Sequence, residues 1–322
     1  MSGERTLRLG FMPLTDSAAL LAGQAMGFFA DEGLDVALSR EASWATVRDK
    51  LAVGALDAAQ VLAPMPLAAT LGAGSEPVPM AAPMILSRDG PAITVSSRLA
   101  AAFGPDGAQG LARLVARRRE EGASPLTFAV VFPYSAHAYL LRGWMADAGL
   151  DLDRDVRLTV VPPPRTAELL AEGVIEGFCA GEPWNLLAEA AGAGRVLARA
   201  ADLLGRSPDK ALGISEAWGE AHPDVRSALV RALVRASAWV GAPENRTAVA
   251  ELLARPEHLG QPVQILRQSL ARVAFGENRP TAEDATWLAG QMRRWGQAGS
   301  EAQAAAGRVF SSQPFDQALR GA

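Results

Sequence analysis

The residues best suited to chemistry are a tryptophan at the entry to a helix and one of two lysines. In the stretch "EASWATVRDKLAVG" the helical pattern begins at about Ala45, and Trp44 stands just in front of it. A helix N-terminus collects unpaired N–H groups and the positive end of the helix dipole, so it is a natural seat for an anion. The Trp44 indole could add an apolar wall and one N–H donor. The alternative is a core position, where most tryptophans pack.

Lysine is scarce in this chain. Of the 31 Lys and Arg residues, Lys50 and Lys210 alone are lysines, and an ammonium is a compact point charge whereas a guanidinium is a planar fork. Lys210 lies in "SPDKALG", a loop that enters a short strand. A buried ammonium without a partner is costly, and a bound monovalent anion would remove that cost. Lys210 is therefore a candidate anion contact, with a surface lysine as the alternative, while codon usage is a sufficient explanation for Lys50.

Four further residues carry weaker indications. His137 stands at the start of the helix predicted after "FPYSA", where the helix dipole disfavours imidazolium, so a neutral ring would act as an N–H donor. Gln60, in "DAAQVLAP", could donate its amide to an anion or bond backbone in the core. Gly90, in "RDGPA", could let the backbone approach a ligand, although a plain turn is the simpler account. Cys179 is expected to be a buried small residue rather than a nucleophile.

The sequence lacks the constellations that catalysis uses. It contains no nucleophile-elbow serine, no glycine-rich phosphate loop, no HxxxH pair and no CxxC. The single cysteine allows no intramolecular disulfide. We therefore expect a binding protein rather than an enzyme, with no metal and no cofactor.

Composition is typical of a globular protein with one large or two medium domains. The chain has 322 residues, 49% of them hydrophobic, and a formal net charge of −4, which allows a sizeable core and argues against nucleic-acid binding. The triplet Arg117, Arg118 and Arg119 is expected at the solvated end of a helix. No apolar run reaches the roughly 18 residues that a membrane span needs, and no secretory signal precedes the first strand. If the chain begins at its natural methionine, these features predict a cytoplasmic protein with no membrane contact.

Apolar, β-branched runs alternate with Ala- and Leu-rich helical patterns, which predicts an α/β architecture. Gly33 and Gly149 end two of the expected helices. Strands are expected over 7–13, 35–41, 80–88, 92–97, 125–133 and 156–164, helices over 17–33, 45–54, 135–149 and 281–296, and mixed strand and helix segments over 57–72, 165–185 and 210–241.

The run "LRLGFMPLTDSAALLAGQAMGFFADEGLDVALSREASWATVRDKLAVGALDAAQVLAPMPLAA" resembles the nitrate-binding members of the solute-binding protein family. These are the substrate subunits of nitrate and bicarbonate ABC importers, together with their cytoplasmic relative, the nitrate/nitrite sensor (NasS-like) of the assimilation operon. The segments "FPYSAHAYLLRGWMADAGL", "GFCAGEPWN" and "SPDKALGISEAW" follow in the expected order and spacing. The resemblance covers most of residues 5–240 and is looser beyond about 240.

The resemblance implies an α/β class II periplasmic-binding-protein fold. In that fold two lobes are joined by two crossing strands and close around a small solute in the cleft between them. The expected lobe I covers 1–92 and 200–322, and lobe II covers 93–199. The crossings are expected near 92–95 and 196–200.

The resemblance also implies a set of ligand-binding residues. Nitrate binders of the family share a lysine at the position of Lys210, whereas bicarbonate binders tend to place a carboxylate there, in keeping with metal-assisted binding. His137 aligns with the family's pocket histidine. Glu182, in "GEPWN", lies where the second lobe faces the cleft; because a carboxylate repels an anion, it would orient Lys210 or bond across the closed lobes. The full set is Trp44, Gln60, Gly90, His137, Glu182 and Lys210.

Three functions stay open. The first is a cytoplasmic sensor of nitrate or nitrite that holds an RNA-binding antitermination regulator (NasT-like) in the absence of the anion and releases it when the anion binds. The second is the substrate-binding subunit of a nitrate or bicarbonate ABC importer. The third is a pyrimidine-precursor synthase on the same fold, which carries a cysteine-rich iron motif that one cysteine cannot supply. The missing export signal favours the sensor.

Overall fold

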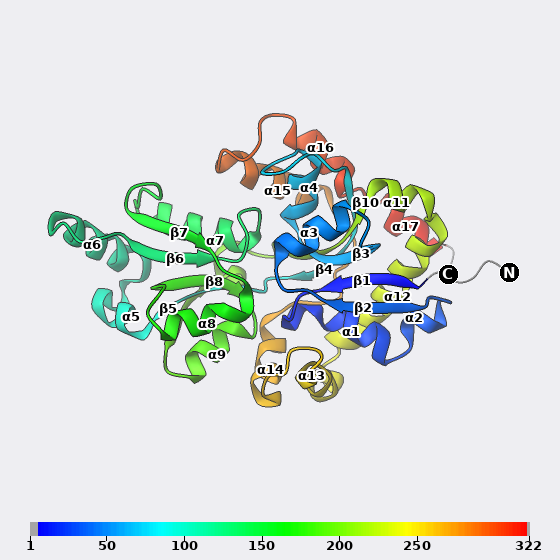
Figure 1. The fold of residues 1–322 in the computed structure, drawn as a ribbon, viewed down its shortest axis with the longest axis horizontal. Coiled ribbons are helices and arrows are strands. Elements are labelled where there is room, and N and C mark those ends of the chain that lie inside the picture. The colour runs from blue at the N-terminus through cyan, green and yellow to red at the C-terminus, as the bar shows by residue number, and fades with distance from the viewer. Residues whose placement is uncertain (1–5, 321–322) are drawn as a thin grey trace. The chain divides into compact units, whose positions relative to one another are not determined.

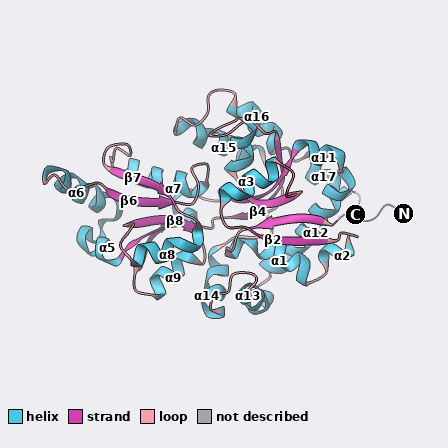
Figure 2. Ribbon diagram, viewed as in Figure 1, coloured by secondary structure: helices cyan, strands magenta, loops and turns pink. Residues whose placement is uncertain are grey.

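The computed structural model describes residues 6–320 and divides the chain into two compact α/β units, each built on one five-stranded sheet (Figures 1 and 2). Unit 1 comprises Met1–Asp89 and Ser207–Ala322, and unit 2 comprises Gly90–Arg206. The segments expected as crossings, 92–95 and 196–200, lie instead within the sheet of unit 2 and at its edge, because 91–96 and 194–199 form two of its strands. The chain enters unit 2 at Gly90 and leaves it after Arg206.

The sheet of unit 1 has the strand order β2-β1-β3-β10-β4. Its strands are β1 (Leu7–Phe11), β2 (Val36–Arg40), β3 (Ala58–Leu62), β4 (Met80–Arg88) and β10 (Pro208–Ser215). The first three pair in parallel, and β10 inserts antiparallel between β3 and β4 with Lys210 opposite Leu62. The carboxyl ends of β1, β2 and β3 therefore share one sheet edge with the beginning of β10.

Helices cover both faces of this sheet, with α1 and α12 on one side and α3 and α4 on the other (Figure 1). The apolar core on the first side joins β1 and β4 to α1, α12 and α13. The helices of unit 1 are η1 (Thr15–Ser17), α1 (Ala18–Ala25), α2 (Phe28–Asp31), α3 (Trp44–Ala52), α4 (Pro64–Thr70), α11 (Glu216–Ala221), α12 (Pro223–Gly241), η3 (Pro243–Asn245), α13 (Arg246–Ala254), α14 (Val263–Ser269), η4 (Leu270–Arg272), α15 (Ala282–Arg294), α16 (Ala302–Val309) and α17 (Gln313–Arg320).

Local capping chemistry explains where several helices begin. The Ser43 hydroxyl accepts a hydrogen bond from the Thr46 N–H, so Ser43 is the N-cap and Trp44 is the first residue of α3 rather than the residue before it. The single helix expected over 17–33 is two helices, because Gly27 adopts a left-handed φ of 78° between them. The helix start expected at Thr281 is confirmed by a capping box with Asp284.

The sheet of unit 2 has the strand order β7-β6-β8-β5-β9. Its parallel strands β6, β7 and β8 are joined by β5, which runs antiparallel with Pro91 opposite Gly181. Packing of α5, α6 and α7 on one face forms a second apolar core. The elements are β5 (Pro91–Ser96), α5 (Ser97–Phe103), η2 (Gly104–Asp106), α6 (Gly107–Glu120), β6 (Leu126–Val130), α7 (Ala136–Ala146), β7 (Val156–Val160), α8 (Pro163–Ala171), β8 (Gly177–Gly181), α9 (Trp184–Ala190), β9 (Gly194–Arg199) and α10 (Ala200–Leu203).

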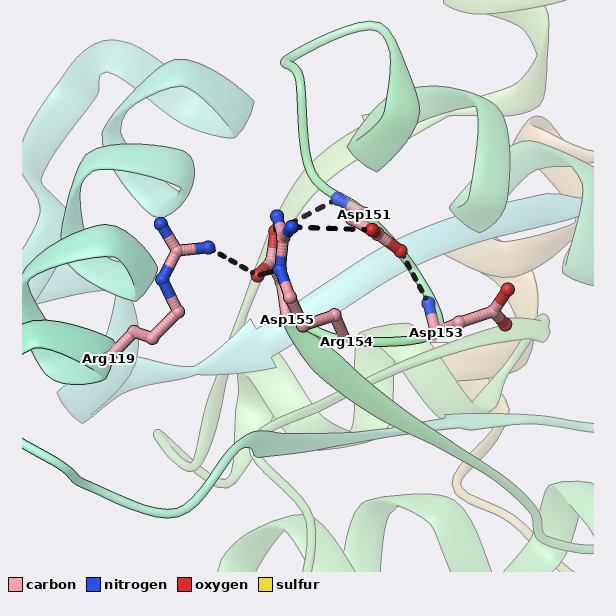
Figure 3. A network of polar contacts seen from close by, with 5 residues as sticks. All are labelled: Arg119, Asp151, Asp153, Arg154 and Asp155. Atoms are coloured by element: carbon pink, nitrogen blue, oxygen red, sulfur yellow. Dashed lines mark hydrogen bonds and ion pairs between the residues drawn. The ribbon is translucent and has the colours of Figure 1, made fainter.

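An ion-pair network fastens the end of α6 to the loop before β7 (Figure 3). The buried Asp155 carboxylate lies 3.0 Å from Arg119 Nη1 and 2.9 Å from Arg154 Nε. The hydrogen bond from Arg154 is the main cause that lowers the pKa of Asp155 to about 2, against the raising effect of burial. As expected, the arginine triplet stands in the last turn of a helix, where cations are favoured. Among the described residues, no helix is long and apolar enough to cross a membrane.

Candidate anion-binding site

Three of the six expected site residues meet at the carboxyl edge of the sheet of unit 1. Trp44 begins α3, which follows β2, while Gln60 lies in β3 and Lys210 is the third residue of β10. The Lys210 Nζ lies 5.7 Å from the centroid of the Trp44 ring, within reach of a cation–π interaction. All three side chains are buried. The parallel arrangement of β1, β2 and β3 therefore brings together residues that are far apart in the sequence.

Lys210 is fully buried, and two carboxylates already pair with it. Its Nζ lies 2.9 Å from Asp16 Oδ2 and 2.7 Å from Asp209 Oδ1, and all three side chains have an exposed fraction of 0%. The sequence interpretation assumed an ammonium with no partner until an anion arrives, and that assumption is wrong. The physical reason is desolvation: a charge with no exposed surface requires opposite charge beside it in every state of the folded protein.

Burial and the neighbouring charges shift the pKa values of Asp209 and Lys210. Burial raises the pKa of Asp209 to about 7, with the charges of Asp16 and Asp89 acting in the same direction against the attraction of Lys210. Burial alone would lower the pKa of Lys210, but the attraction of Asp16 and Asp209 outweighs it and leaves that pKa raised. Lys210 therefore stays an ammonium, while Asp209 is the carboxylate whose protonation changes near neutral pH.

Both polar atoms of the Gln60 side chain form hydrogen bonds within the protein. Its Oε1 accepts a hydrogen bond from the Met12 N–H at 3.0 Å, and its Nε2 donates to Asp16 Oδ1 at 2.5 Å. The sequence left two alternatives for Gln60, an anion contact or hydrogen bonds within the core, and the structure shows hydrogen bonds within the core. Gln60 thus links β3 to the loop after β1 and holds the Asp16 carboxylate in place beside Lys210.

Trp44 presents a donor with nothing to accept it. The side chain is 1% exposed, and within the described part of the chain its buried Nε1 has no hydrogen-bond partner. A buried N–H that lacks an acceptor is rare in folded proteins and destabilising. The indole therefore combines a packed position with an N–H that a ligand could satisfy.

The other three expected residues lie at one edge of the sheet of unit 2. Because Pro91 is opposite Gly181, Gly90 and Glu182 flank the same end of the β5–β8 ladder. His137 is the second residue of α7, which follows β6, a strand parallel to β8. The side chains of His137 and Glu182 are buried, with exposed fractions of 0% and 1%.

The structure adds details on the surroundings of Gly90 and Glu182. Gly90 follows Asp89, which adopts a left-handed φ of 66°, while Gly90 itself has no positive φ. Glu182 Oε2 accepts from the Leu186 N–H at 3.2 Å in the first turn of α9, whereas the carboxylates that pair with Lys210 are those of Asp16 and Asp209. Cys179 is buried in β8, as expected.

Sequence reasoning missed both partners of Lys210. Asp209 precedes Lys210 directly, and Asp16 follows the first strand in "PLTDSAA". An acid next to the rare lysine was a usable signal for an ion pair, but Asp16 had none, because its approach depends on how β10 returns to the sheet. Within residues 6–320, no group of three or more His, Cys, Asp or Glu side chains is placed to hold a metal ion.

Comparison with known proteins defines the family. The family described as NMT1-like matches residues 2–254. The chain belongs to the NMT1-like family. Among its relatives, the nitrate import ATP-binding protein NrtC of Synechocystis sp. is 35% identical in an alignment of 311 positions that covers 90% of this chain and 46% of that protein. The bicarbonate-binding protein CmpA of Synechococcus sp. is 31% identical in an alignment of 279 positions that covers 83% of this chain and 60% of that protein.

The fold is shared with a solved structure of this family. The crystal structure of the periplasmic nitrate-binding protein NrtA from Synechocystis PCC 6803 superposes with a TM-score of 0.89 at 26% identity, over 98% of this chain and 88% of that one. This likeness confirms the periplasmic-binding-protein fold, and together with the identity to CmpA it confirms the resemblance to nitrate- and bicarbonate-binding proteins. The NMT1-like chain spans about half of NrtC and under two thirds of CmpA.

Proposed function

We propose that this NMT1-like chain is the solute-binding unit of a nitrate import system, that it binds a small monovalent oxyanion, and that it catalyses no reaction. Relatives named for nitrate and for bicarbonate support an oxyanion ligand. Nitrate is the first choice because Lys210 supplies an ammonium at the position where, by family resemblance, bicarbonate binders tend to have a carboxylate. Bicarbonate is the alternative ligand within the same function.

The observation that carries the proposal is the unsatisfied indole N–H of Trp44 beside the buried ammonium of Lys210. An ammonium has three N–H donors, and the two carboxylates leave at least one of them for a ligand. Nitrate is planar, monovalent and weakly hydrated, so it can lie against a flat aromatic wall and accept from both donors. His137 and Gly90 remain proposed contacts, and Glu182 and Gln60 are proposed to hold the site in shape.

Isothermal titration calorimetry of the full chain with nitrate, nitrite, bicarbonate, sulfate and chloride tests this function. We expect nitrate or nitrite to bind with a Kd of about 1 μM, which corresponds to about 8 kcal/mol. Lys210→Glu should abolish binding, and Lys50→Glu is the matched control because Lys50 pairs with Glu41 at a partly exposed position. Circular dichroism establishes that both variants are folded. Unchanged nitrate affinity in a folded Lys210→Glu variant would remove Lys210 from the site, and no binding of any oxyanion would refute the function.

A cytoplasmic sensor is the second candidate, and one observation favours it. Identity is higher with the ATP-binding protein NrtC than with the binding protein CmpA, 35% against 31%, and covers 90% rather than 83% of the chain. A unit like this one therefore makes up about half of a protein named for ATP binding, and ATP is bound inside the cell. Inside the cell, such a unit would signal the presence of the anion rather than deliver it to an importer.

The two candidates differ in location and partner. The importer function predicts recovery of the protein outside the cytoplasm, in the periplasmic fraction. The sensor function predicts a cytoplasmic protein that retains an RNA-binding antitermination regulator in a pull-down without nitrate and releases it with nitrate. Equal retention with and without nitrate would refute the sensor. The relatives described above are binding and import proteins, which is why the importer stands first.

A further inference from the structure

The buried cluster of Asp16, Asp209 and Lys210 in unit 1 contains two acids and one ammonium. Asp16 and Asp209 share the single ammonium of Lys210, with N–O distances of 2.9 and 2.7 Å, and none of the three side chains is exposed. With both carboxylates ionised, the three groups sum to one negative charge. If an anion binds here, as proposed above, it brings a second negative charge into the same desolvated region, which opposes binding.

The groups around Asp209 add to this repulsion. Asp209 pairs with Lys210 of its own strand, β10, and it is subject to the charges of Asp16 in η1 and of Asp89 just after β4. Two of these three neighbours are acids. Protonation of one carboxylate would make the cluster neutral, so that the Lys210 ammonium would face one carboxylate and the bound anion rather than two carboxylates and the anion.

The two carboxylates are not equivalent as proton acceptors. Asp16 receives a short hydrogen bond from Gln60 on Oδ1 and lies beside the Lys210 ammonium with Oδ2, so each of its oxygens already contacts a donor. Asp209 is subject to the negative charges of Asp16 and Asp89, and burial raises its pKa towards neutrality. A proton that enters the cluster therefore goes to Asp209.

We propose that the chain binds nitrate together with one proton from solvent, and that Asp209 is the residue that accepts it. One O–H bond forms on the Asp209 carboxyl, the buffer loses the proton, and no other bond changes. The inference rests on the proposed anion-binding function and deepens it, since it makes Asp209 a determinant of specificity. A monovalent anion needs one proton to balance its charge, and a dianion such as sulfate would need two.

Calorimetry in paired buffers measures this proton directly. Nitrate is titrated into the full chain at pH 6.0, 7.0, 8.0 and 8.5, at each pH in two buffers that contain no oxyanion and whose ionisation enthalpies differ. We expect net uptake of about one proton at pH 8.0 and above and little at pH 6.0, where Asp209 is already protonated in the free chain. Above pH 8 the affinity for nitrate should fall about tenfold per pH unit.

Two variants assign the proton to a residue. Asp209→Asn should bind nitrate with no proton uptake and with the same affinity at pH 6.0 and 8.5. Asp155→Asn, which removes a buried acid in unit 2, should keep the pH dependence of the wild type. Uptake that persists in Asp209→Asn would refute the assignment to Asp209.

Titrations of the wild type test the coupled proton even if Asp209→Asn fails to fold. Nitrate binding with equal enthalpy in both buffers at pH 8.5 overturns the coupled proton and leaves the proposed anion-binding function intact. Failure of nitrate to bind at every pH overturns both. Tight binding of sulfate with uptake of one proton or fewer would contradict the specificity argument.

Discussion

The Lys210 ammonium lies 5.7 Å from the centroid of the Trp44 ring, and both side chains are buried. The contact joins the first turn of α3 to the start of β10, two elements at one edge of the sheet. Because the ring attracts the cation through its face, the indole N–H at the ring edge is left for another acceptor. The indole thus helps to hold the ammonium and separately presents a donor.

Trp44→Phe separates these two roles. Phenylalanine keeps an apolar ring and loses the N–H, so we expect nitrate affinity to fall about tenfold, the effect of one hydrogen bond to a charged group worth about 1.5 kcal/mol. The melting temperature should stay equal or rise, because a buried N–H without an acceptor disappears. Trp218→Phe, at a partly buried position in α11 of the same unit, is the control and should leave affinity unchanged. Wild-type affinity in Trp44→Phe would show that the indole N–H does not contact nitrate.

Gln60→Leu tests the support beneath Lys210. The substitution leaves the buried Met12 N–H without its acceptor and removes the donor that Gln60 provides to Asp16. Each loss typically costs about 1–3 kcal/mol, so the free energy of unfolding should fall by about 2–4 kcal/mol in urea titrations. Gln24→Leu, on the exposed side of α1, should change it by less than about 0.5 kcal/mol. Equal effects of the two substitutions would mean that Gln60 has no supporting role.

The Arg88–Asp284 pair is a second buried ion pair of unit 1. Arg88 at the end of β4 donates to both carboxylate oxygens of Asp284 at 2.6 and 2.9 Å. Asp284→Asn leaves a buried guanidinium without its main counter-charge and weakens the capping box of α15, so we expect a loss of about 3–5 kcal/mol in the free energy of unfolding.

The double variant Arg88→Met/Asp284→Leu gives the comparison for that pair. It leaves no buried charge at this position, so it should be more stable than Asp284→Asn alone when both are unfolded in urea. A double variant less stable than the single one would show that the pair contributes net attraction beyond mutual neutralisation.

Local pattern predicted much of the fold, whereas the ion pairs of the candidate site depend on tertiary structure. The strands near Leu7 and Val36 and the helix start at Thr281 follow from periodicity and capping residues, which act over a few positions. The ion pair between Asp16 and Lys210 does not, because it exists only once β10 has returned between β3 and β4. Gly27 was visible in the sequence, but its left-handed turn was hidden inside an otherwise continuous helical pattern.

Asp209 should give the free chain an unusual dependence on pH. Its pKa is raised in the folded state to about 7 from an ordinary value of 3.8, so the folded state binds a proton more tightly than the unfolded state does. This group therefore contributes stability that is complete below about pH 3.8 and is lost as the pH rises through about 7. Urea unfolding at pH 5.0, 6.0, 7.0 and 8.0 should show the wild type losing stability relative to Asp209→Asn over this range. A constant difference between the two proteins would contradict the raised pKa.

The stability that Asp155 contributes depends on pH in the opposite direction from that of Asp209. Its folded-state pKa is lowered to about 2 from 3.8, chiefly by the hydrogen bond from Arg154, so the stability it contributes is present above about pH 3.8 and disappears as the pH falls through about 2. The shift corresponds to at most about 2.5 kcal/mol, and exposure of both arginines to solvent and salt reduces it to about 1–2 kcal/mol. Asp155→Asn should therefore be less stable than the wild type by this amount at pH 7 and equally stable at pH 2.

Salt and a neighbouring acid provide the controls for Asp155. Adding 1 M sodium chloride should shrink the difference at pH 7, because the Debye length falls to about 3 Å and both arginine side chains are more than half exposed. Asp153→Asn changes an exposed acid in the same loop, whose backbone N–H donates to Asp151, and should leave the free energy of unfolding near that of the wild type. If Asp155→Asn and the wild type lost stability in parallel down to pH 2, the ion pairs that join the end of α6 to the loop before β7 would contribute nothing to acid resistance.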